Sequence, residues 1–288
     1  GVYLLMETVS KGEGRVDIPT PEPNSRMTSY IVEIDRAEKL MFPLNDFLVD
    51  TYRVYPSATE LTYPTDQQYS DARFSFIDED FSKIAKNLYQ IPYGKESNDY
   101  KSLIDETAFY DYFIVNELFR NVDAGYYSTY FYRNLRGKLT PVVWDFNNSL
   151  NNYQEVSFDE TGFSLVEAPL FEQLLIEERF VEGLIDRYHL LRANKLSDDR
   201  LDGLVDASVQ YLGDAITRNN NRWSRYFDHS QYSTSDFLQP IERNPTSYEA
   251  ALVQMKDYLF RRSQWLDDHI DVLYQYSHPS RHSFSSVK

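Results

Sequence analysis

The sequence predicts an α+β fold, with a small β-rich N-terminal part and a larger, mostly helical C-terminal lobe that contains a β-hairpin. Three observations lead to this prediction. Residues 1–60 hold β-rich runs between turn-forming residues, the chain after about residue 66 shows helical spacing of apolar side chains, and one strand–turn–strand pattern interrupts the helices at 129–146. We expect three regions, which are the N-terminal part at 1–60, the helical lobe at 61–276 and a flexible tail at 277–288.

Two runs in the N-terminal part have the composition of strands. They are "VYLLMETV" at 2–9 and "YIVEIDR" at 30–36, and the Gly, Pro, Ser and Asn residues between them are typical of turns. Because the chain opens at Gly1, directly before residues that already have strand composition, we expect further sequence upstream.

The first helices of the C-terminal lobe are predicted at 76–91 and after Asp105. Apolar residues recur at spacings of three and four in the first, which indicates an amphipathic helix. In the second, Asp105 is a plausible N-cap, Glu106 lies in the first turn, and Gly125 lies where a stop signal is expected. This second helix is apolar on more than one side, so we expect it to be buried and central.

The predicted hairpin follows, and then three long helices. Its strands are expected at 129–133 and 139–146, and "NLRGK" between them supplies the turn. The later helices are predicted at 171–196, 199–216 and 247–273.

Composition excludes several classes of protein and partner. The net charge of −16 disfavours nucleic acid and anionic membranes and favours basic partners, although solubility alone would also explain it. The absence of cysteine excludes disulfides, zinc thiolate sites, iron–sulfur clusters and thiol catalysis. No apolar run approaches the ~20 residues of a membrane span. We therefore expect no nucleic-acid binding and no membrane span, and we expect a monomer.

Several catalytic and metal-binding motifs are also missing from the sequence. It has no H-E-x-x-H, no G-x-S-x-G elbow, no P-loop and no G-x-G-x-x-G. The spaced pair His278 and His282 lies in the polar tail, where a metal site is not expected.

Two aspartates bracket the predicted hairpin. Asp123 follows the central helix and Asp145 ends the second strand. In an antiparallel hairpin the start of the first strand lies beside the end of the second, so both could converge with Ser128, Asn147 and Asn148. Two carboxylates with nearby amide and hydroxyl oxygens suit a hard cation such as Mg²⁺. The alternative is that each aspartate only caps its helix or strand.

The order of these elements resembles that of protein kinases. Asp123 is followed five residues later by Ser128, and Asp145–Phe146 comes after the hairpin, as D-F-G follows H-R-D-x-x-x-x-N in kinases. "YLLMETVSKGEG" is similar to a kinase hinge. The closer resemblance is to the CotH (spore coat protein H) kinase family, an atypical kinase-like family. It is carried by "GVYLLMETV", by residues 104–150 with their N-x-D, hairpin and W-D-F, by residues 170–197 and by "YLFRRSQWLDDHIDVL".

This resemblance implies an atypical protein-kinase-like fold with a truncated N-terminal lobe, and Mg-ATP-dependent phosphorylation of serine on a basic, Ser-rich protein. It implies an extracellular or cell- or spore-surface location. The implied residues fall into three groups: catalytic Asp123 and Asp145; cofactor-binding Met6, Glu7, Ser128 and Asn148; and metal-binding Asp145, Asn147 and Ser128.

The sequence departs from this family in two places. The family reads W-D-F-D, whereas Asn147 stands at the second acid here, which lowers the charge available to a metal. The strand that carries the phosphate-binding lysine is missing before Gly1, and neither Lys11 nor Lys39 has a strand context that would replace it. Two alternatives therefore stay open: a catalytically weak or inactive scaffold or binding module on a surface, and a metal-dependent hydrolase built on Asp123 and Asp145.

Overall fold

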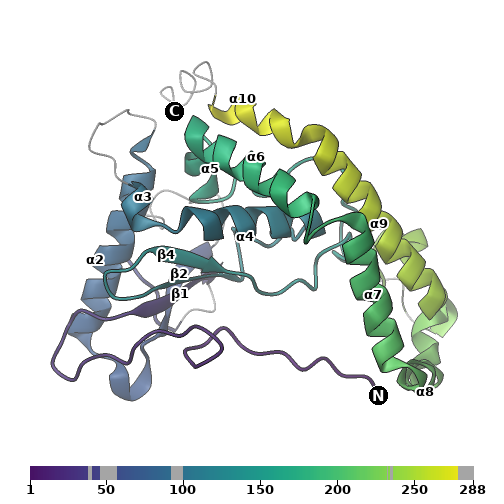
Figure 1. Cartoon of the computed structure of the whole chain (residues 1–288). Coiled ribbons are helices and arrows are strands. Elements are labelled where there is room, and N and C mark those ends of the chain that lie inside the picture. The colour runs from purple at the N-terminus through teal and green to yellow at the C-terminus, as the bar shows by residue number, and fades with distance from the viewer. Residues whose placement is uncertain (38–40, 46–56, 92–99, 232, 234–235, 278–288) are drawn as a thin grey trace.

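A four-stranded antiparallel sheet joins the N-terminal part of the chain to the hairpin (Figure 1). The computed structural model describes residues 1–37, 41–45, 57–91, 100–231, 233 and 236–277. The strand order is β2-β1-β3-β4. The strands are β1 (Tyr30–Arg36), β2 (Ser57–Tyr63), β3 (Thr129–Arg133) and β4 (Leu139–Val142). With the helices described below, this sheet confirms the predicted α+β class.

The register of the sheet sets which side chains meet. β1 lies between β2 and β3. Its pairing with β3 runs as far as Ile34, which lies opposite Thr129 at the start of β3. Side chains alternate along a strand, so Tyr30, Val32 and Ile34 enter the main core while Ile31 packs on the opposite face. The end of β1, the start of β3 and the end of β4 therefore meet at one edge of the sheet.

The helix that precedes the hairpin is central and buried, as predicted. α4 (Glu106–Phe119) starts at Asp105, whose side chain accepts a hydrogen bond from the backbone N–H of Ala108. Its rings pack with Phe131 of β3 and with Phe171 in the main core. Two helices precede it, α2 (Asp71–Leu88), which Ser70 caps, and the short α3 (Tyr100–Leu103).

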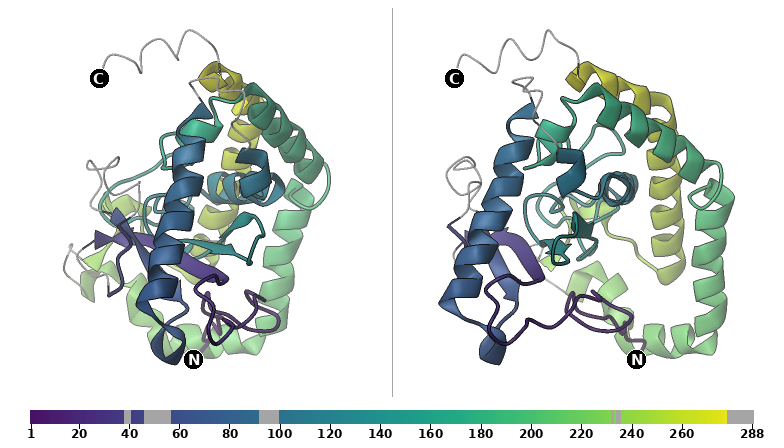
Figure 2. Two further views of the ribbon diagram at one scale, coloured as in Figure 1. Left: turned by 90° about the vertical axis from the view of Figure 1, so that its left-hand side faces the viewer. Right: turned by 60° about the vertical axis from the view of Figure 1, so that its left-hand side comes forward.

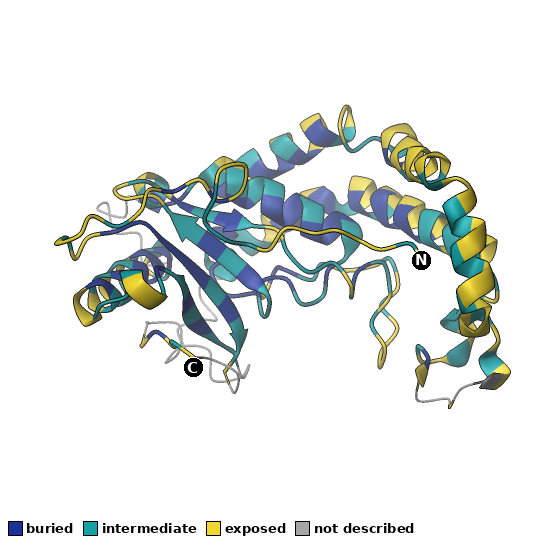
Figure 3. Ribbon diagram, turned by 90° about the horizontal axis from the view of Figure 1, so that it is seen from below, coloured by how far each residue is buried: buried dark blue, intermediate teal, exposed yellow. Residues whose placement is uncertain are grey.

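The later helices surround α4 on the side away from α2 (Figures 1 and 2). α6 and α9 pack against α4, and α7 runs beside α9. Figure 3 shows that α7 and α8 are exposed over most of their surface. These helices are α5 (Phe171–Leu174), α6 (Glu178–Arg192), α7 (Asp198–Leu212), α8 (Asp214–Trp223), α9 (Tyr248–His269) and α10 (Tyr274–Ser277), with 3-10 turns at 66–68, 224–227, 229–231, 241–243 and 270–273.

The predicted strand at 2–9 is wrong. This segment has no regular secondary structure, and the side chain of Leu5 is 98% exposed. β propensity makes a strand only where a neighbouring strand supplies hydrogen bonds, and none of the residues that the structure describes pairs with 2–9.

Several predicted boundaries also differ. α4 ends at Phe119, where Arg120 adopts a left-handed conformation, so Gly125 is not the helix stop. Gly125 instead lies in a tight loop with φ of +84°, and a Cβ there would lie 2.5 Å from the Cβ of Ala168. The second hairpin strand ends at Val142, short of the predicted residue 146.

The long helices predicted after the hairpin differ in extent. The segment 171–196 forms two helices, and the last helix passes into a 3-10 turn at 270–273. The helix at 199–216 divides at Gly213 into α7 and α8. Apart from Ser277, which ends α10, the predicted tail lies outside the described residues, as do His278, His282 and Lys39. No described helix has both the length and the apolar composition that a membrane span requires.

Candidate functional site

Two loops meet at the sheet edge where β1, β3 and β4 come together. The first runs from the end of α4 to Ser128, and the second follows β4 through Asp145. Ser128 has a φ of 48° and Asp145 a φ of 56°, both in the left-handed region that L-residues rarely occupy. Such conformations cost on the order of 1–3 kcal/mol each and are concentrated at functional sites.

Side-chain contacts bring four of the predicted site residues together. Asn148 Nδ2 donates to Asp123 Oδ2 at 2.6 Å, and Ser128 Oγ donates to Asp145 Oδ2 at 3.5 Å. Each contact joins one loop to the other, so Asp123, Ser128, Asp145 and Asn148 form one cluster. The prediction that Asp145 ends the second strand is wrong, because β4 ends at Val142, three residues earlier, and Asp145 lies in the loop that follows.

Asn147 lies at the margin of this cluster. Its side chain is exposed and donates to Asn148 Oδ1 at 3.2 Å, while its carbonyl accepts from Asn152. It also lines a separate cavity of about 520 Å³ that α9 borders. No described contact joins the Asn147 side chain to Asp145.

Two buried asparagines, Asn116 and Asn121, form a hydrogen-bonded chain that reaches the backbone of Asp145. Asn121 is 1% exposed, and its Nδ2 donates to Asn116 Oδ1 at 3.1 Å and to the carbonyl of Asp145 at 3.2 Å. Asn116 in turn donates to the carbonyl of Tyr112 at 2.8 Å. The Oδ1 atom of Asn121 has no hydrogen-bond partner among the described residues. The N-x-D pattern at 121–123 was the available signal for this residue, but sequence reasoning did not assign it a role.

The end of β1 adds charged groups that sequence reasoning also missed. Arg36 Nη2 lies 4.0 Å from Asp123 Oδ1, and its guanidinium carbon lies 4.3 Å from the ring centroid of Tyr127. Burial, together with the neighbouring carboxylates of Asp35 and Glu60, raises the pKa of Glu33 to about 7, against an opposing hydrogen bond with Tyr130. The site is therefore rich in carboxylates and includes one half-exposed cation.

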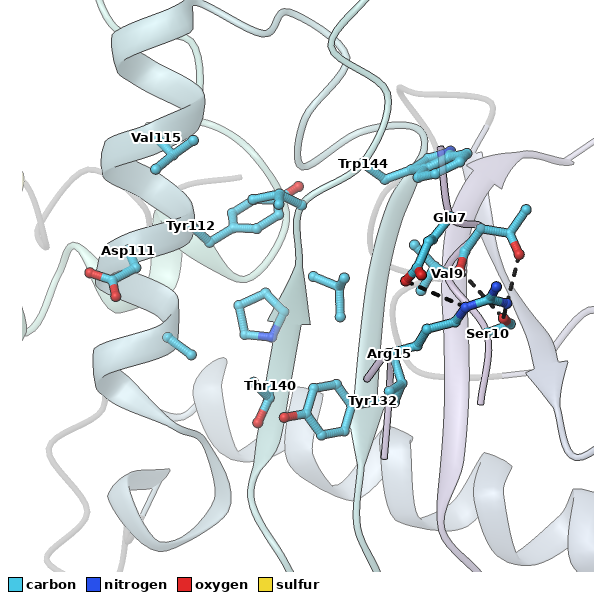
Figure 4. A pocket seen from close by; sticks show the side chains of 16 residues that line it. Glu7, Val9, Ser10, Arg15, Asp111, Tyr112, Val115, Tyr132, Thr140 and Trp144 are labelled. Atoms are coloured by element: carbon cyan, nitrogen blue, oxygen red, sulfur yellow. Dashed lines mark hydrogen bonds and ion pairs between the residues drawn. The ribbon is translucent and has the colours of Figure 1, made fainter. Parts of the chain in front are cut away.

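A cavity of about 540 Å³ adjoins this cluster at Trp144. Its walls come from residues 7–10, the hairpin and one face of α4 (Figure 4). Glu7 lines it and pairs with Arg15 at 3.4 Å, whereas Met6 is exposed and does not line it. Tyr130 packs edge-on against Trp144, which ties the cavity wall to β3.

The residues present fit a magnesium ion that is shared with a ligand. Asp123, Asp145 and Ser128 offer the oxygen donors that hard cations prefer. Among the described residues, no group of three or more acidic or histidine side chains could hold a metal alone. Mg²⁺ at phosphate sites commonly uses one or two carboxylates and takes its other ligands from waters and phosphates. The cluster matches this arrangement, in which one or two carboxylates hold the ion together with waters and phosphates.

Comparison with known families identifies one match. A family model described as "CotH kinase protein" matches residues 1–266, which is nearly the whole chain. No curated protein matches the sequence.

Proposed function

The chain belongs to the CotH kinase family, and we propose that it transfers the γ-phosphoryl group of Mg-ATP to serine residues of a basic, Ser-rich protein. The observation that carries this proposal is the single cluster formed by Asp123, Ser128, Asp145 and Asn148 at the sheet edge. The net charge of −16 favours a basic substrate. An extracellular, cell-surface or spore-surface location is part of the same proposal.

Asp145 is the proposed metal-binding acid. Its carboxylate faces Ser128, and its carbonyl is held by buried Asn121, so the backbone that carries the carboxylate is fixed before a ligand arrives. When bound, Mg²⁺ would neutralise charge on the ATP phosphates. Ser128 would offer its hydroxyl group, and Asn148 its side-chain amide group, to the metal or the phosphates, and Asn147 would contribute only after a change of its side-chain conformation.

Asp123 is the proposed catalytic acid–base residue. One carboxylate oxygen accepts from Asn148, which leaves the other to accept the proton of a substrate hydroxyl. In the proposed step the serine oxygen forms a bond to the γ-phosphorus. The bond from that phosphorus to the β–γ bridging oxygen breaks, ADP leaves, and the serine proton passes to Asp123.

The cavity beside Trp144 is the proposed site of the nucleotide base. Val9, Val142 and Trp144 give it apolar walls, and the backbone of residues 7–9 offers hydrogen-bonding groups, as a kinase hinge does. Glu7 keeps the role that the resemblance implies. Met6, which lies outside the cavity lining, would need to move to reach a base there.

One observation favours a second candidate, a catalytically weak or inactive binding module. Asn147 replaces an acid of the family motif, and its side chain contacts Asn148 rather than Asp145. The hydrolase alternative has less support. In the described part of the chain, the side-chain partners of Asp123 and Asp145 are amide, hydroxyl and guanidinium groups, and none of these is a general base.

Calorimetry of the full-length protein with ATP tests the metal role of Asp145. We expect Asp145→Asn to abolish magnesium-dependent ATP binding, because the carboxylate charge is lost while the side-chain shape is kept. Asp257→Asn, on α9 in an exposed ion pair with Arg261 at 2.9 Å, is the matched control. An unchanged isotherm for Asp145→Asn would show that the assignment is wrong.

Transfer of labelled phosphate to a Ser/Arg/Lys-rich peptide then separates the two candidates. A wild-type protein that transfers phosphate is a kinase. A wild-type protein that binds Mg-ATP or the peptide without transfer is a binding module.

A further inference from the structure

We propose that Arg36 is the phosphate-binding cation of this site, with its guanidinium donating to oxygens of the terminal phosphates of the nucleotide. This inference rests on the proposed function, and it assigns a residue that neither the kinase-like motif order nor the family match identifies.

The fold places Arg36 at the reacting groups. β1 pairs with β3 up to Ile34 and Thr129, so the next residues of β1 extend past the start of β3. Arg36 thereby reaches the loop that contains Asp123 and Tyr127. The backbone that presents this side chain is held on one side, by the pairing of Arg36 with Ser57 of β2.

The contacts of Arg36 leave its donors available. Its distances to Asp123 Oδ1 (4.0 Å) and Asp35 Oδ1 (3.5 Å) are those of loose ion pairs, and Arg36 donates no hydrogen bond to any residue that the structure describes. The side chain is 40% exposed and rests on the Tyr127 ring. Stacking of this kind orients a guanidinium while its N–H groups stay free, and those groups match phosphate oxygens in pairs.

The carboxylates around Arg36 explain why a cation would be needed at this place to bind phosphate. Asp35, Asp123 and Asp145 are gathered at this edge, and a triphosphate that carries several negative charges would be repelled by them. One magnesium ion offsets two of those charges. Arg36 supplies a further positive charge beside Asp123, where the phosphoryl group would be transferred. A purely structural role explains the arrangement less well, because partly exposed pairs at such distances contribute about 0–1 kcal/mol.

Titration calorimetry with three probes tests the assignment in the full-length protein. The probes are Mg-ATP, adenosine, and Mg-tripolyphosphate. We expect Arg36→Gln to weaken binding of Mg-ATP and Mg-tripolyphosphate by about ten- to a hundredfold, as for loss of a charge-assisted hydrogen bond, and to leave adenosine binding unchanged. Arg36→Lys should give intermediate affinity, because an ammonium binds phosphate as a point charge.

Arg26→Gln is the matched control. Arg26 is an exposed arginine that pairs loosely with Glu79 at 3.6 Å, and we expect no change with any probe. Equal weakening of adenosine and Mg-ATP by Arg36→Gln, or no weakening of either, would overturn the assignment.

The outcome also distinguishes this inference from the proposed function. Tripolyphosphate binding that depends on Arg36, without phosphate transfer by the wild type, upholds the assignment and overturns the kinase activity. Phosphate transfer and ATP affinity that are unchanged in Arg36→Gln uphold the kinase and overturn the assignment. A wild type that binds neither phosphate probe overturns both.

Discussion

Two arginine–carboxylate pairs in this protein differ in almost every respect. Arg262 and Glu117 are 0% and 1% exposed and lie 2.7 Å apart between α9 and α4, whereas Arg36 and Asp123 are partly exposed and 4.0 Å apart. Arg262 also donates to the carbonyls of Glu117, Glu160 and Gly162 at 2.6–2.8 Å. The first pair has its donors satisfied by protein, and the second does not.

The buried pair serves to hold the segment that follows the site. Glu117 accepts from the backbone N–H groups of Ser164 and Leu165, at 2.8 and 2.6 Å. Two further arginines bind the same stretch: Arg120 donates to carbonyls at 161 and 162, and Arg243 to carbonyls at 151 and 153. Three guanidinium groups thus fix the chain from 151 to 162. The comparison indicates that Arg262, whose donors are satisfied by the protein, is structural, and that Arg36, whose donors are not, is available for a ligand.

The largest expected effect is on activity, at the partly exposed pair of Arg36 and Asp123. Asp123→Asn should slow phosphate transfer by about a hundred- to ten-thousandfold, because the amide cannot accept the serine proton. Its stability should change by less than about 1 kcal/mol, since the Arg36 contact is loose and partly solvated. Transfer assays and urea unfolding of the same samples measure both. If Asp123→Asn unfolded at a lower urea concentration and kept its specific activity, this pair would be the structural one and the contrast between the two pairs would be reversed.

The next effect is on stability, at the buried pair. Arg262→Met should lower the free energy of unfolding by about 3–5 kcal/mol, because it leaves the Glu117 charge and several carbonyls buried without partners. The matched control is Arg36→Met, for which about 1 kcal/mol or less is expected. Urea unfolding at pH 7 measures both variants. Equal losses in the two variants would remove the distinction between the pairs.

The smallest expected effect is a pH dependence near the site. Glu33 has a folded pKa of about 7, above its ordinary value of 4.5, so the folded state holds a proton that the unfolded state has released. Stability from this group is full below about pH 4.5 and is lost as the pH rises to about 7. Glu33→Gln should remove that slope and stabilise the protein most at pH 8. Thermal unfolding from pH 5 to pH 8 measures it, and identical profiles for the two proteins would contradict the assignment.

Local signals in the sequence were sufficient for the parts of the fold that depend on near neighbours. The Asp105 cap and the hairpin at 129–142 follow from short-range spacing, and the structure contains both. The strand at 2–9 failed because β propensity cannot supply a pairing partner. The prediction of the end of α4 is wrong because Arg120, an ordinary helix former, takes the left-handed conformation that was expected at a glycine.

The site residues likewise divide into those that local sequence predicts and those that only long-range pairing brings together. Asp123, Ser128 and Asp145 are close in sequence to one hairpin, so antiparallel pairing predicted their proximity. Arg36 is near Asp123 only because β1 pairs with β3, and Arg262 meets Glu117 across 145 positions of chain. No local pattern carries that information. The carbonyl of Asp145, a residue with a left-handed backbone, likewise accepts a hydrogen bond from buried Asn121, a contact that becomes visible only in three dimensions.

The position of β1 inside the sheet has a consequence for synthesis on the ribosome. β1 needs β3 as a partner, and Thr129 lies about 100 residues after Tyr30. At roughly 5–20 residues per second, β1 waits about 5–20 s with one hydrogen-bonding edge open. Unpaired edges of apolar strands are prone to pair with other chains, and β1 carries Tyr30, Val32 and Ile34. The nascent chain is therefore most exposed to aggregation, and most dependent on chaperones, before its hairpin emerges.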